Sequence, residues 1–473
     1  MGTVRFFRHS TRLFRYHVPT EFVLLAIIEF LALMLSLYLS LEFRFFDDDW
    51  TRSLGSFLPR AILYATVMQL SLVAFGVYQR QTGRFFEALV LRIASGLLLG
   101  LIPLGVSFYL APTLFLGRGV LALSVFFSFI FISLIRLYFR RVVKEHNMWS
   151  RILVLGSGEN ANLVKAEQKE GGLNGLNIIG YVSLPGDKVC GLEEEAITLN
   201  QRLVQYVQEK DVDEIVLAMD DRRTAHIPPR DLLDCKMSGI DILDMVTFFE
   251  RRTGKIRLDI MNPSWLYLSD GFYESTFRNL GKRIFDIAIV LFFLPVALPM
   301  MLLVTMAIFI ESQGRGPIFY SQTRVKQYGE PFQIYKFRSM VSDAEKDGIA
   351  RWASKNDSRI TRVGSILRKG RLDELPQLFN VLKGDMSFVG PRPERPEFVE
   401  KLAKKIPYYE ERHRVKPGLT GWAQISYSYA DTEDDSLEKL QYDLYYVKNY
   451  SIFLDLLILL QTVEVVLLSK GAQ

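Results

Sequence analysis

Long apolar runs dominate the first third of the chain. Four windows, 22–41, 61–78, 88–110 and 120–137, are apolar over enough residues to cross a bilayer as helices, which takes about 20 such residues. We expect no cleavable signal peptide, because the first run is too long for the apolar part of one and no small-residue cleavage site follows it. The pattern predicts a four-helix transmembrane region over residues 1–145.

The charges between these runs predict how the region is oriented. Three aspartates, 47–49, follow the first run, whereas Arg80 and Arg84 follow the second. The N-terminus and the exit from the fourth run are also basic, through Arg5, Arg8, Arg12, Arg15, Arg136, Arg140, Arg141 and Lys144. Positively charged loops stay on the cytoplasmic side. We therefore expect the chain to continue in the cytoplasm after about residue 138.

A fifth apolar run, 284–310, has a different pattern. A straight helix of this length would extend roughly 40 Å and could cross the membrane. However, basic residues flank both ends, and Pro295 and Pro299 lie near the middle, where each removes a backbone hydrogen bond and bends a helix. A helix that enters one leaflet, breaks and returns to the same face fits both observations. The alternative is a fifth crossing with a proline kink. The flanking basic residues are Lys282, Arg283, Arg315, Arg324 and Lys326.

The middle of the chain alternates between strand and helix patterns, which is typical of a Rossmann-like α/β module. Its first strand runs into a G-x-G-x-x-A turn at 156–161. The acidic residue that a dinucleotide site needs at the end of the second strand is absent, since Ser183 follows Val182. We interpret the module as structural or regulatory, without a bound cofactor. The predicted strands are 152–155, 178–182 and 214–218, and the predicted helix is 199–209.

Short helices and loops rich in Pro, Gly and Arg follow the fifth apolar run. A last apolar stretch, 452–468, contains Asp455 and Glu464. A charge at the bilayer centre costs about 2.5–3.5 kcal/mol, so we expect a helix at the membrane surface rather than a crossing. The whole pattern predicts an α/β membrane protein with three parts: the transmembrane region (1–145), the Rossmann-like module (146–270), and the re-entrant helix with a mainly α-helical catalytic domain (271–473).

Composition limits the chemistry that the chain can carry. The net charge of +5 and the pI near 8.9 suit anionic lipids or phosphorylated substrates and do not indicate a nucleic-acid partner. Two distant cysteines, Cys190 and Cys235, exclude a disulfide scaffold, and no Cys/His spacing suggests zinc. The five histidines are scattered, which leaves little room for a histidine-based site.

The segment 372–384 carries the strongest candidate chemistry. A helix tolerates Pro376 in its first turn, so we expect the adjacent carboxylates of Asp373 and Glu374 at the N-terminus of a short helix that Gly384 ends. This end of a helix attracts phosphate. Such pairs are common as simple helix-end charges. The basic surroundings favour instead a carboxylate that attacks phosphorus beside one that holds a metal ion. The surrounding residues are Arg362, Arg368, Lys369, Arg371, Arg392 and Arg395.

Four strings in this part of the chain carry a family resemblance: KFRSM (336–340), DELPQ (373–377), GDMSFVGPRP (384–393) and KPGLTGWAQ (416–424). In order and spacing they resemble the bacterial sugar transferases called monotopic phosphoglycosyl transferases. The resemblance covers about 280–470. It implies transfer of a sugar 1-phosphate from a nucleotide sugar, by family habit a UDP-sugar, to undecaprenyl phosphate, which starts exopolysaccharide or O-antigen assembly. The larger, exopolysaccharide-type members look similar to this chain throughout.

The resemblance also implies roles for individual residues. Asp373 would be the nucleophile that takes the sugar phosphate as an acyl phosphate, and Glu374 would join it in holding Mg²⁺. Pro295 would mark the break of the re-entrant helix, where Leu294 replaces a serine common in small members. The phosphates would bind Lys336, Arg338, Arg368 and Arg392. The protein would lie in the bacterial inner membrane, among its lipids, with the catalytic domain on the cytoplasmic face.

The chemistry of these residue types agrees with that reading. Transfer between phosphates has a highly anionic transition state, which positioned cations stabilise. Arg offers a bidentate fork to phosphate oxygens, and Mg²⁺ usually takes only one or two protein carboxylates. A covalent aspartyl phosphate would split the exchange into two displacements and give ping-pong kinetics. One site could then serve a soluble donor and a lipid acceptor.

Two other functions stay open from the residues alone. A membrane-anchored, NAD-dependent nucleotide-sugar dehydratase or epimerase would need a second glycine fingerprint and a Tyr-x-x-x-Lys pair after residue 280, and neither occurs. The pair Tyr206 and Lys210 has that spacing but lies on a helix with a surface-like pattern. A scaffold with a degenerate site is the second alternative, against which the intact Asp373 and Glu374 argue.

Some features receive no catalytic role. Arg362, Lys369 and Arg371 can equally face lipid, and His413 is interpreted as structural. Trp422 can support a nucleotide or simply pack. A homodimer is plausible, and the identity of the sugar is not readable from the residues.

Overall fold

The computed structural model describes residues 10–13, 16–45, 56–78, 86–145, 150–173, 176–184, 190, 192, 195–199, 201–220, 229–272, 274–341, 359–427 and 432–467. The chain divides into two compact units, Met1–Met261 and Asn262–Gln473. The three domain boundaries expected from the sequence stay a prediction. The acidic loop 47–49 and the basic loop with Arg80 and Arg84 lie outside the described residues.

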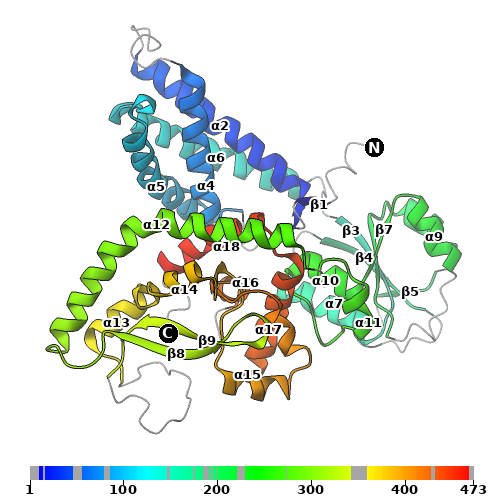
Figure 1. Ribbon diagram of the computed structural model, residues 1–473. Helices are drawn as coiled ribbons and strands as arrows, with labels where there is room; N and C mark the ends of the chain where they lie inside the picture. The colour runs from blue at the N-terminus through cyan, green and yellow to red at the C-terminus, as the bar shows by residue number, and fades with distance from the viewer. Residues whose placement is uncertain are drawn as a thin grey trace. The chain divides into compact units, whose positions relative to one another are not determined.

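The predicted apolar runs form long helices in the first unit (Figure 1). A short hairpin of β1 (Ser10–Leu13) and β2 (Tyr16–Pro19) precedes them. The helices are α2 (Thr20–Arg44), α4 (Phe57–Ala74), α5 (Phe86–Leu110) and α6 (Arg118–Glu145), with a 3₁₀ turn η2 (Pro112–Leu114) before α6. Within the described residues, these four and one helix of the second unit are long and apolar enough to cross a membrane.

A buried ion pair joins two of these helices. Arg136 of α6 donates to both carboxylate oxygens of Glu29 in α2, at 3.0 Å for one of them, and also to the backbone oxygen of Val77 at 2.9 Å. Large apolar side chains such as Leu31 and Ile102 face outward and are 59% and 64% exposed. The bundle therefore pairs these two charges inside and presents apolar side chains outside, as a lipid-facing helix bundle does.

The α/β region confirms the predicted strand and helix alternation. In the part of the chain that the structure describes, five strands form one parallel sheet in the order β5-β4-β3-β6-β7. The strands at 150–155, 176–182 and 214–217 match the expected ones. Two further strands were not predicted. The strands are β3 (Ser150–Leu155), β4 (Leu176–Val182), β5 (Ala196–Ile197), β6 (Glu214–Leu217) and β7 (Asp241–Asp244).

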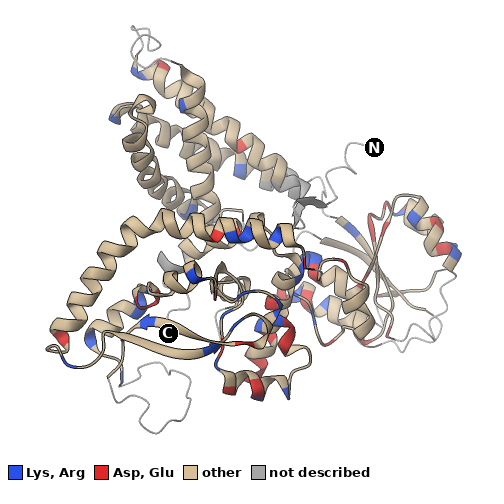
Figure 2. Cartoon of the chain, viewed as in Figure 1, with Lys and Arg blue, Asp and Glu red and all other residues tan. Residues whose placement is uncertain are grey.

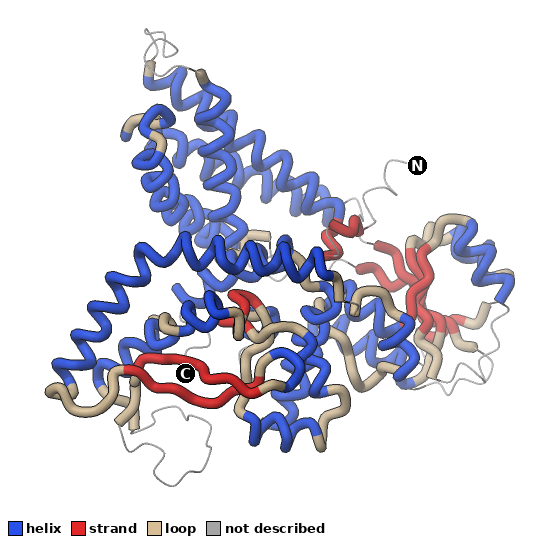
Figure 3. Tube along the Cα trace, in the orientation of Figure 1, coloured by secondary structure: helices blue, strands red, loops and turns tan. Residues whose placement is uncertain are grey.

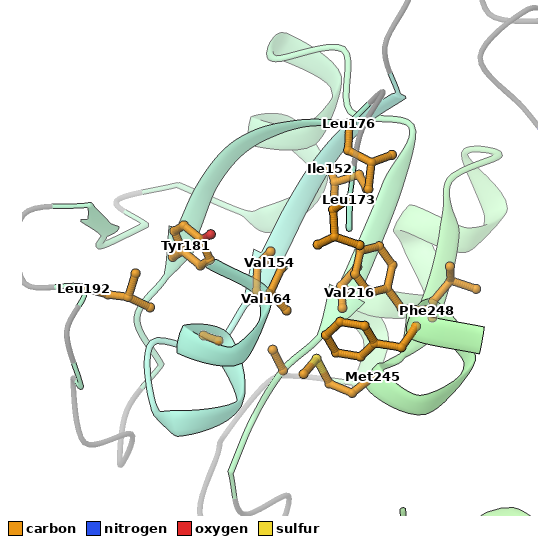
Figure 4. Packing of buried hydrophobic residues seen from close by; sticks show 14 residues of the cluster. Ile152, Val154, Val164, Leu173, Leu176, Tyr181, Leu192, Val216, Met245 and Phe248 are labelled. Carbon is orange, nitrogen blue, oxygen red and sulfur yellow. The ribbon is translucent and has the colours of Figure 1, made fainter. Parts of the chain in front are cut away.

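Helices cover both faces of this sheet because side chains alternate along its strands. Ile152 and Val154 of β3 point into a core with Val164 and Phe248 (Figure 4), while Leu153 points into the opposite core. The helices are α7 (Glu159–Glu170), α8 (Leu203–Glu209), α9 (Pro229–Met237) and α10 (Met245–Thr253). The predicted helix 199–209 is thus shorter than expected. Tyr206 packs against one of these cores, as a structural residue does.

The glycine turn after β3 is closed by a carboxylate of the protein itself. Asp220 accepts hydrogen bonds from the backbone N–H groups of Glu159 and Asn160, both at 2.9 Å, at the N-terminus of α7. A Cβ atom at Gly158 would lie 1.9 Å from Asp220 Oδ2, so this approach requires glycine. In dinucleotide-binding folds a pyrophosphate occupies the corresponding place. Here a carboxylate satisfies the same N–H groups.

The second unit begins with α11 (Pro263–Leu268) and the long helix α12 (Thr276–Glu311). The structure corrects one expectation: α12 stays helical through Pro295 and Pro299 instead of breaking there. The helix bends along its length, as Figures 1 and 3 show. Proline in a helix interior removes one hydrogen bond and displaces one carbonyl, which permits a bend while the flanking turns remain paired. In Figure 2 the charges of α12 gather near its ends.

Several of the following elements pack against one face of α12. Val290, Ala297, Val304 and Ile308 share a buried cluster with Phe337 and residues of the following helices. The elements are β8 (Phe319–Val325), η3 (Gln327–Gly329), β9 (Pro331–Phe337), α13 (Arg362–Lys369), η4 (Leu372–Glu374), α14 (Gln377–Lys383), β10 (Ser387–Val389), α15 (Pro396–Ala403), η5 (Tyr409–Arg414), β11 (Gly418–Thr420), α16 (Trp422–Ser426), α17 (Glu433–Asn449) and α18 (Ile452–Leu467).

Candidate active site

The two carboxylates precede the short helix rather than open it. Asp373 and Glu374 lie in the 3₁₀ turn η4, and Pro376 occupies the N-cap position of α14. This corrects the expectation that Pro376 lies in the first helical turn. The other end is as predicted, because Gly384 has φ 97° and ends α14 in the left-handed conformation. Arg371, before the turn, is also left-handed with φ 51°.

A buried amide fixes α14 against the neighbouring strand. Asn380 is fully buried; its Oδ1 accepts from the Tyr335 N–H at 3.1 Å and its Nδ2 donates to the Gln333 oxygen at 2.8 Å. At the other end of α14, Arg283 of α12 donates to the carbonyl oxygens of Val381 and Leu382. Polar groups buried in this way are costly to leave unpaired, so they hold the helix in one position on β9. The sequence pattern marked Arg283 only as a basic residue flanking the fifth apolar run and did not single out Asn380.

Three cations surround Glu374. Lys336 Nζ of β9 lies 3.0 Å and Arg392 NH2 lies 3.2 Å from the same carboxylate oxygen, Oε1. Arg371 lies 3.9 Å from Oε2. Burial opposes ionisation, but the charges of Lys336, Arg392 and Arg371 outweigh it and hold the pKa of Glu374 far below its usual range. Glu374 is therefore a carboxylate at any physiological pH.

Asp373 has a different environment although it is the adjacent residue. Its side chain is 7% exposed, and it accepts no hydrogen bond from any residue that the structure describes. Burial raises the pKa of Asp373, and the charge of Glu374 raises it further, while Lys336 and Arg368 oppose the shift. A carboxylate that is shielded from water and not engaged by hydrogen bonds is a stronger nucleophile than a solvated one.

The other predicted phosphate-binding residues are partly brought to this site. Arg368 lies in the last turn of α13, and its positive charge lowers the pKa of Asp373. Arg338, just after β9, donates to the backbone oxygen of Arg315 at 3.2 Å and is directed to the loop that follows α12. Arg371, which the sequence left as possibly facing lipid, lies beside Glu374 instead. Its position three residues before Glu374 was the signal that could have revealed it.

A second polar cluster supports Arg392 from behind. Arg412 is buried and forms an ion pair with Asp443 at 2.8 Å, donates to Tyr409 Oη at 2.7 Å and donates to the backbone oxygen of Arg392 at 3.0 Å. These contacts orient the loop that presents Arg392 to Glu374. The neighbouring His413 keeps its neutral form, because burial lowers the pKa of its imidazole to about 3 and the charge of Arg412 adds to this. The structural interpretation of His413 fits this environment.

The residues fit a magnesium ion held mainly by substrate and water. Among the described residues, no group of three or more His, Cys, Asp or Glu side chains is arranged as a metal site. Magnesium needs fewer, since it typically binds one or two carboxylates together with phosphate oxygens and waters. Among the described residues, Glu374 Oε1 is contacted by Lys336 and Arg392, while Oε2 has only Arg371 at 3.9 Å. Glu374 Oε2 and the Asp373 carboxylate are thus the two candidate ligands.

Comparison with known proteins places this site in a family. Residues 277–469 match the profile described as bacterial sugar transferase. The chain is 40% identical over 196 residues to a UDP-glucose:undecaprenyl-phosphate glucose-1-phosphate transferase of Caulobacter vibrioides and covers 72% of that protein. The chain belongs to the bacterial sugar transferase family. The match spans the membrane helix α12 together with all the residues of the candidate site.

Two further relatives extend the similarity toward the N-terminus. A UDP-N-acetylgalactosamine-undecaprenyl-phosphate N-acetylgalactosaminephosphotransferase of Aeromonas hydrophila is 40% identical over 261 residues, 55% of this chain. A UDP-glucose:undecaprenyl-phosphate glucose-1-phosphate transferase of Escherichia coli is 34% identical over 304 residues, 63% of this chain. The chain spans 60% and 63% of the lengths of these two relatives. Residues 73–234 match a second profile, described as a CoA-binding domain.

Proposed function

We propose that this sugar transferase moves a sugar 1-phosphate from a UDP-sugar to undecaprenyl phosphate through a covalent intermediate on Asp373. A carboxylate oxygen of Asp373 forms a bond to the sugar-bearing phosphorus of the donor, as the bond from that phosphorus to the bridging oxygen breaks. Uridine monophosphate leaves with the bridging oxygen. A phosphate oxygen of undecaprenyl phosphate then attacks the same phosphorus, and the Asp373 carboxylate is regenerated. The product would begin the assembly of an exopolysaccharide or an O-antigen.

The contrast between the two adjacent carboxylates carries this proposal. Asp373 is buried and accepts no hydrogen bond within the described residues, while Glu374 is held by Lys336 and Arg392. The first arrangement suits a nucleophile, because the carboxylate loses little hydrogen bonding when it attacks. The second suits a residue that must stay in place and stay ionised. Cations already gathered around the pair can stabilise the negative charge that develops on the transferring phosphoryl group.

Divalent magnesium is proposed as the cofactor, held by Asp373 and Glu374. When bound, it would neutralise charge on the donor diphosphate. The protein's own part is to position: Lys336, Arg368 and Arg392 would bind donor phosphate oxygens, and Arg338 would contact the donor from the edge of the site. Arg392 is well suited to this because its side chain is still 40% exposed while one guanidinium nitrogen contacts Glu374.

The attachment of α12 supports a re-entrant helix rather than a crossing one. Near its start, Lys282 donates to the backbone oxygen of Val389 at 3.0 Å. At its far end, Glu311 accepts from the Val363 N–H at 3.0 Å. Both partners belong to the same compact unit, so both ends of α12 contact it. We infer that α12 dips into one leaflet of the bacterial inner membrane and returns, with the catalytic domain on the cytoplasmic face and four N-terminal helices that cross.

A labelling experiment tests this topology. Cys190 and Cys235 are replaced by serine, and single cysteines are placed at the two ends of α12 as Ser275→Cys or Ser312→Cys. We expect a membrane-impermeant maleimide to label neither in intact cells and both after permeabilisation. If only Ser312→Cys reacted in intact cells, α12 would cross the membrane and the re-entrant proposal would fail.

The alternative function, a nicotinamide-dependent dehydratase or epimerase, has no support from the relatives, whose names are those of undecaprenyl-phosphate transferases. Asp220 also occupies the backbone N–H groups that a dinucleotide would need. A homodimer, expected from the sequence, stays a prediction.

Release of uridine monophosphate tests the reaction directly. The purified chain in lipid nanodiscs is mixed with magnesium, undecaprenyl phosphate and a panel of UDP-sugars. We expect uridine monophosphate and a lipid-linked sugar phosphate with one donor or a few. Without the acceptor, we expect about one uridine monophosphate per chain, with the sugar phosphate attached to the peptide that contains Asp373. Turnover in the absence of any adduct would exclude the covalent mechanism, and a nicotinamide absorbance change would favour the alternative.

A further inference from the structure

A basic pocket lies at the start of α12, away from the two catalytic carboxylates. Lys282, Arg283 and Asp286 of α12 form one side of it, and Tyr328, Lys416 and Tyr450 form the other. Arg283 contacts the carbonyl groups at the C-terminal end of α14, whereas Asp373 and Glu374 precede its N-terminal end. The seven residues of α14 separate the two places by about 10 Å. None of the residues of this pocket has a role in the proposed reaction.

Most of the charges in the pocket are satisfied internally. Lys282 Nζ contacts Asp455 at 2.6 Å, Tyr446 Oη at 2.9 Å and the Val389 oxygen at 3.0 Å, so all three of its protons are used. Asp286 accepts from Ser387 Oγ at 2.9 Å and from the Phe388 N–H at 3.0 Å. These contacts tie α12 to α18 and to β10. The partners of Asp286 are neutral, so its charge forms no ion pair within the described residues, and it attracts Lys416 in the same pocket.

Arg283 and Lys416 differ, because neither forms an ion pair with a carboxylate among the described residues. Arg283 donates to the neutral carbonyl oxygens of Val381 and Leu382. Lys416 forms no hydrogen bond or ion pair with any residue that the structure describes. The nearby Asp385 is already paired with Lys326 at 3.2 Å and with Lys383 at 2.9 Å.

The two cations face the same small space beside Gly384. The position of a Cβ atom on Gly384 is 3.5 Å from an Arg283 guanidinium nitrogen and 3.7 Å from Lys416 Nζ. Burial lowers the pKa of Lys416, and the charge of Arg283 lowers it further. The carboxylates of Asp286 and Asp385 oppose this shift, but neither forms an ion pair with Arg283 or Lys416 among the described residues. Two partly buried cations without an ion-pair partner favour an anion at that point, since an anion would relieve both the repulsion and the lost hydration.

The surface next to these cations is apolar. Phe277, Leu280 and Ile284 follow one another at helical spacing along the first turns of α12 and are 90%, 57% and 61% exposed. Tyr328 is 64% exposed beside the pocket, and tyrosine is enriched where membrane meets water. An occupant with an anionic head and an apolar tail would fit both the cation pair and this exposed face.

We propose that the pocket binds the phosphate headgroup of an anionic glycerophospholipid, whose acyl chains lie along the exposed apolar face of α12. Such a lipid would fix the depth at which α12 enters the bilayer. The proposal needs only that α12 is in the membrane, so it does not depend on the covalent mechanism.

Lipid binding to the delipidated chain tests the proposal. Phosphatidylglycerol or phosphatidylcholine is titrated into the protein in neutral detergent, without donor or magnesium, and bound lipid is counted by native mass spectrometry. We expect phosphatidylglycerol to bind in preference to phosphatidylcholine, and Lys416→Gln to weaken its binding about tenfold, as expected for loss of one charge-assisted hydrogen bond. Lys416→Arg should restore it, which also shows that the site tolerates substitution.

Matched controls separate this site from general surface charge. Lys383→Gln removes a nearby exposed lysine, 69% exposed, and should leave binding unchanged. Equal binding of phosphatidylglycerol by the wild type and Lys416→Gln would overturn the proposal, and so would equal binding of phosphatidylcholine. Displacement of the lipid by millimolar inorganic phosphate would show a free-phosphate site instead. Displacement by equimolar undecaprenyl phosphate would show an acceptor site, and either result contradicts a glycerophospholipid site. Failure of turnover leaves these binding measurements unaffected.

Discussion

Two regions of this protein have the sequence pattern of a phosphate site, yet the structure gives them opposite charges. At the glycine turn after β3, the N–H groups of Glu159 and Asn160 are satisfied by the carboxylate of Asp220. At η4, a carboxylate is surrounded by Lys336, Arg392 and Arg371. The first region supplies its own anion, whereas the second gathers an excess of cations. A backbone motif therefore permits phosphate binding, but side chains distant in the sequence determine whether the site is free to bind a phosphate.

The largest effect is expected for Asp373→Asn, which keeps the side chain's shape and removes the nucleophile. We expect turnover to fall by at least about a thousandfold, as in other enzymes that lose a covalent nucleophile, and the protein adduct to disappear. Release of uridine monophosphate measures the first and mass spectrometry of the intact chain the second. Asp385→Asn is the matched control, because Asp385 pairs with Lys326 and Lys383 outside the site. Near-normal turnover by Asp373→Asn would show that Asp373 is not the nucleophile, and η4 would then no longer differ from the glycine turn by its phosphate chemistry.

Glu374→Gln should have the next largest effect. The substitution removes the carboxylate charge that both Lys336 and Arg392 contact, so these cations are no longer held in place for the donor phosphates. It also removes a candidate metal ligand. We expect turnover to fall by about a hundredfold to a thousandfold, as when a preorganised electrostatic contact is removed. A magnesium titration should show that more metal is needed for half-maximal rate. An unchanged magnesium requirement would argue that Glu374 only orients the cations.

Lys336→Met should change how the rate depends on pH. Asp373 must be ionised to attack, burial raises its pKa, and the charge of Lys336 lowers it. Removing that charge therefore raises the pKa of Asp373 further, and a larger fraction of the nucleophile is protonated at a given acidic pH. We expect the acid limb of the kcat/KM profile to move to higher pH than in the wild type, at the same saturating magnesium. Lys383→Met, on the far end of α14, is the control. If the acid limb of Lys336→Met stayed at the wild-type pH, a group other than Asp373 would be responsible for it.

The smallest effect is expected in the first region. Asp220→Ala removes the acceptor at the N-terminus of α7, which typically costs about 1 kcal/mol. Hydrogen exchange in the intact chain should become faster at the amides of Glu159 and Asn160, about fivefold for that energy. Turnover should stay unchanged. Tight binding of a nicotinamide dinucleotide by the wild-type chain would contradict the role assigned to Asp220.

Local patterns predicted the elements well wherever an element depends on its own residues. The apolar runs became α2, α4, α5, α6 and α12, and the buried strand patterns became β3, β4 and β6. Gly384 ended α14 as expected. Shorter elements such as β5 were not predicted, because two residues carry too little pattern and pair only once β4 is in place.

Composition and spacing are local properties, so they were sufficient to predict an Asp-Glu pair among basic residues in a chain with long apolar helices. The sequence also carried the family resemblance. The cations that reach Glu374 became known from the folded chain, since Lys336 is 38 residues before it and Arg392 is 18 residues after it. The fold likewise brought Asp220 to the turn at α7 and both ends of α12 to one domain. Contacts of this kind depend on how separate elements pack, and side-chain packing has no counterpart in a local pattern.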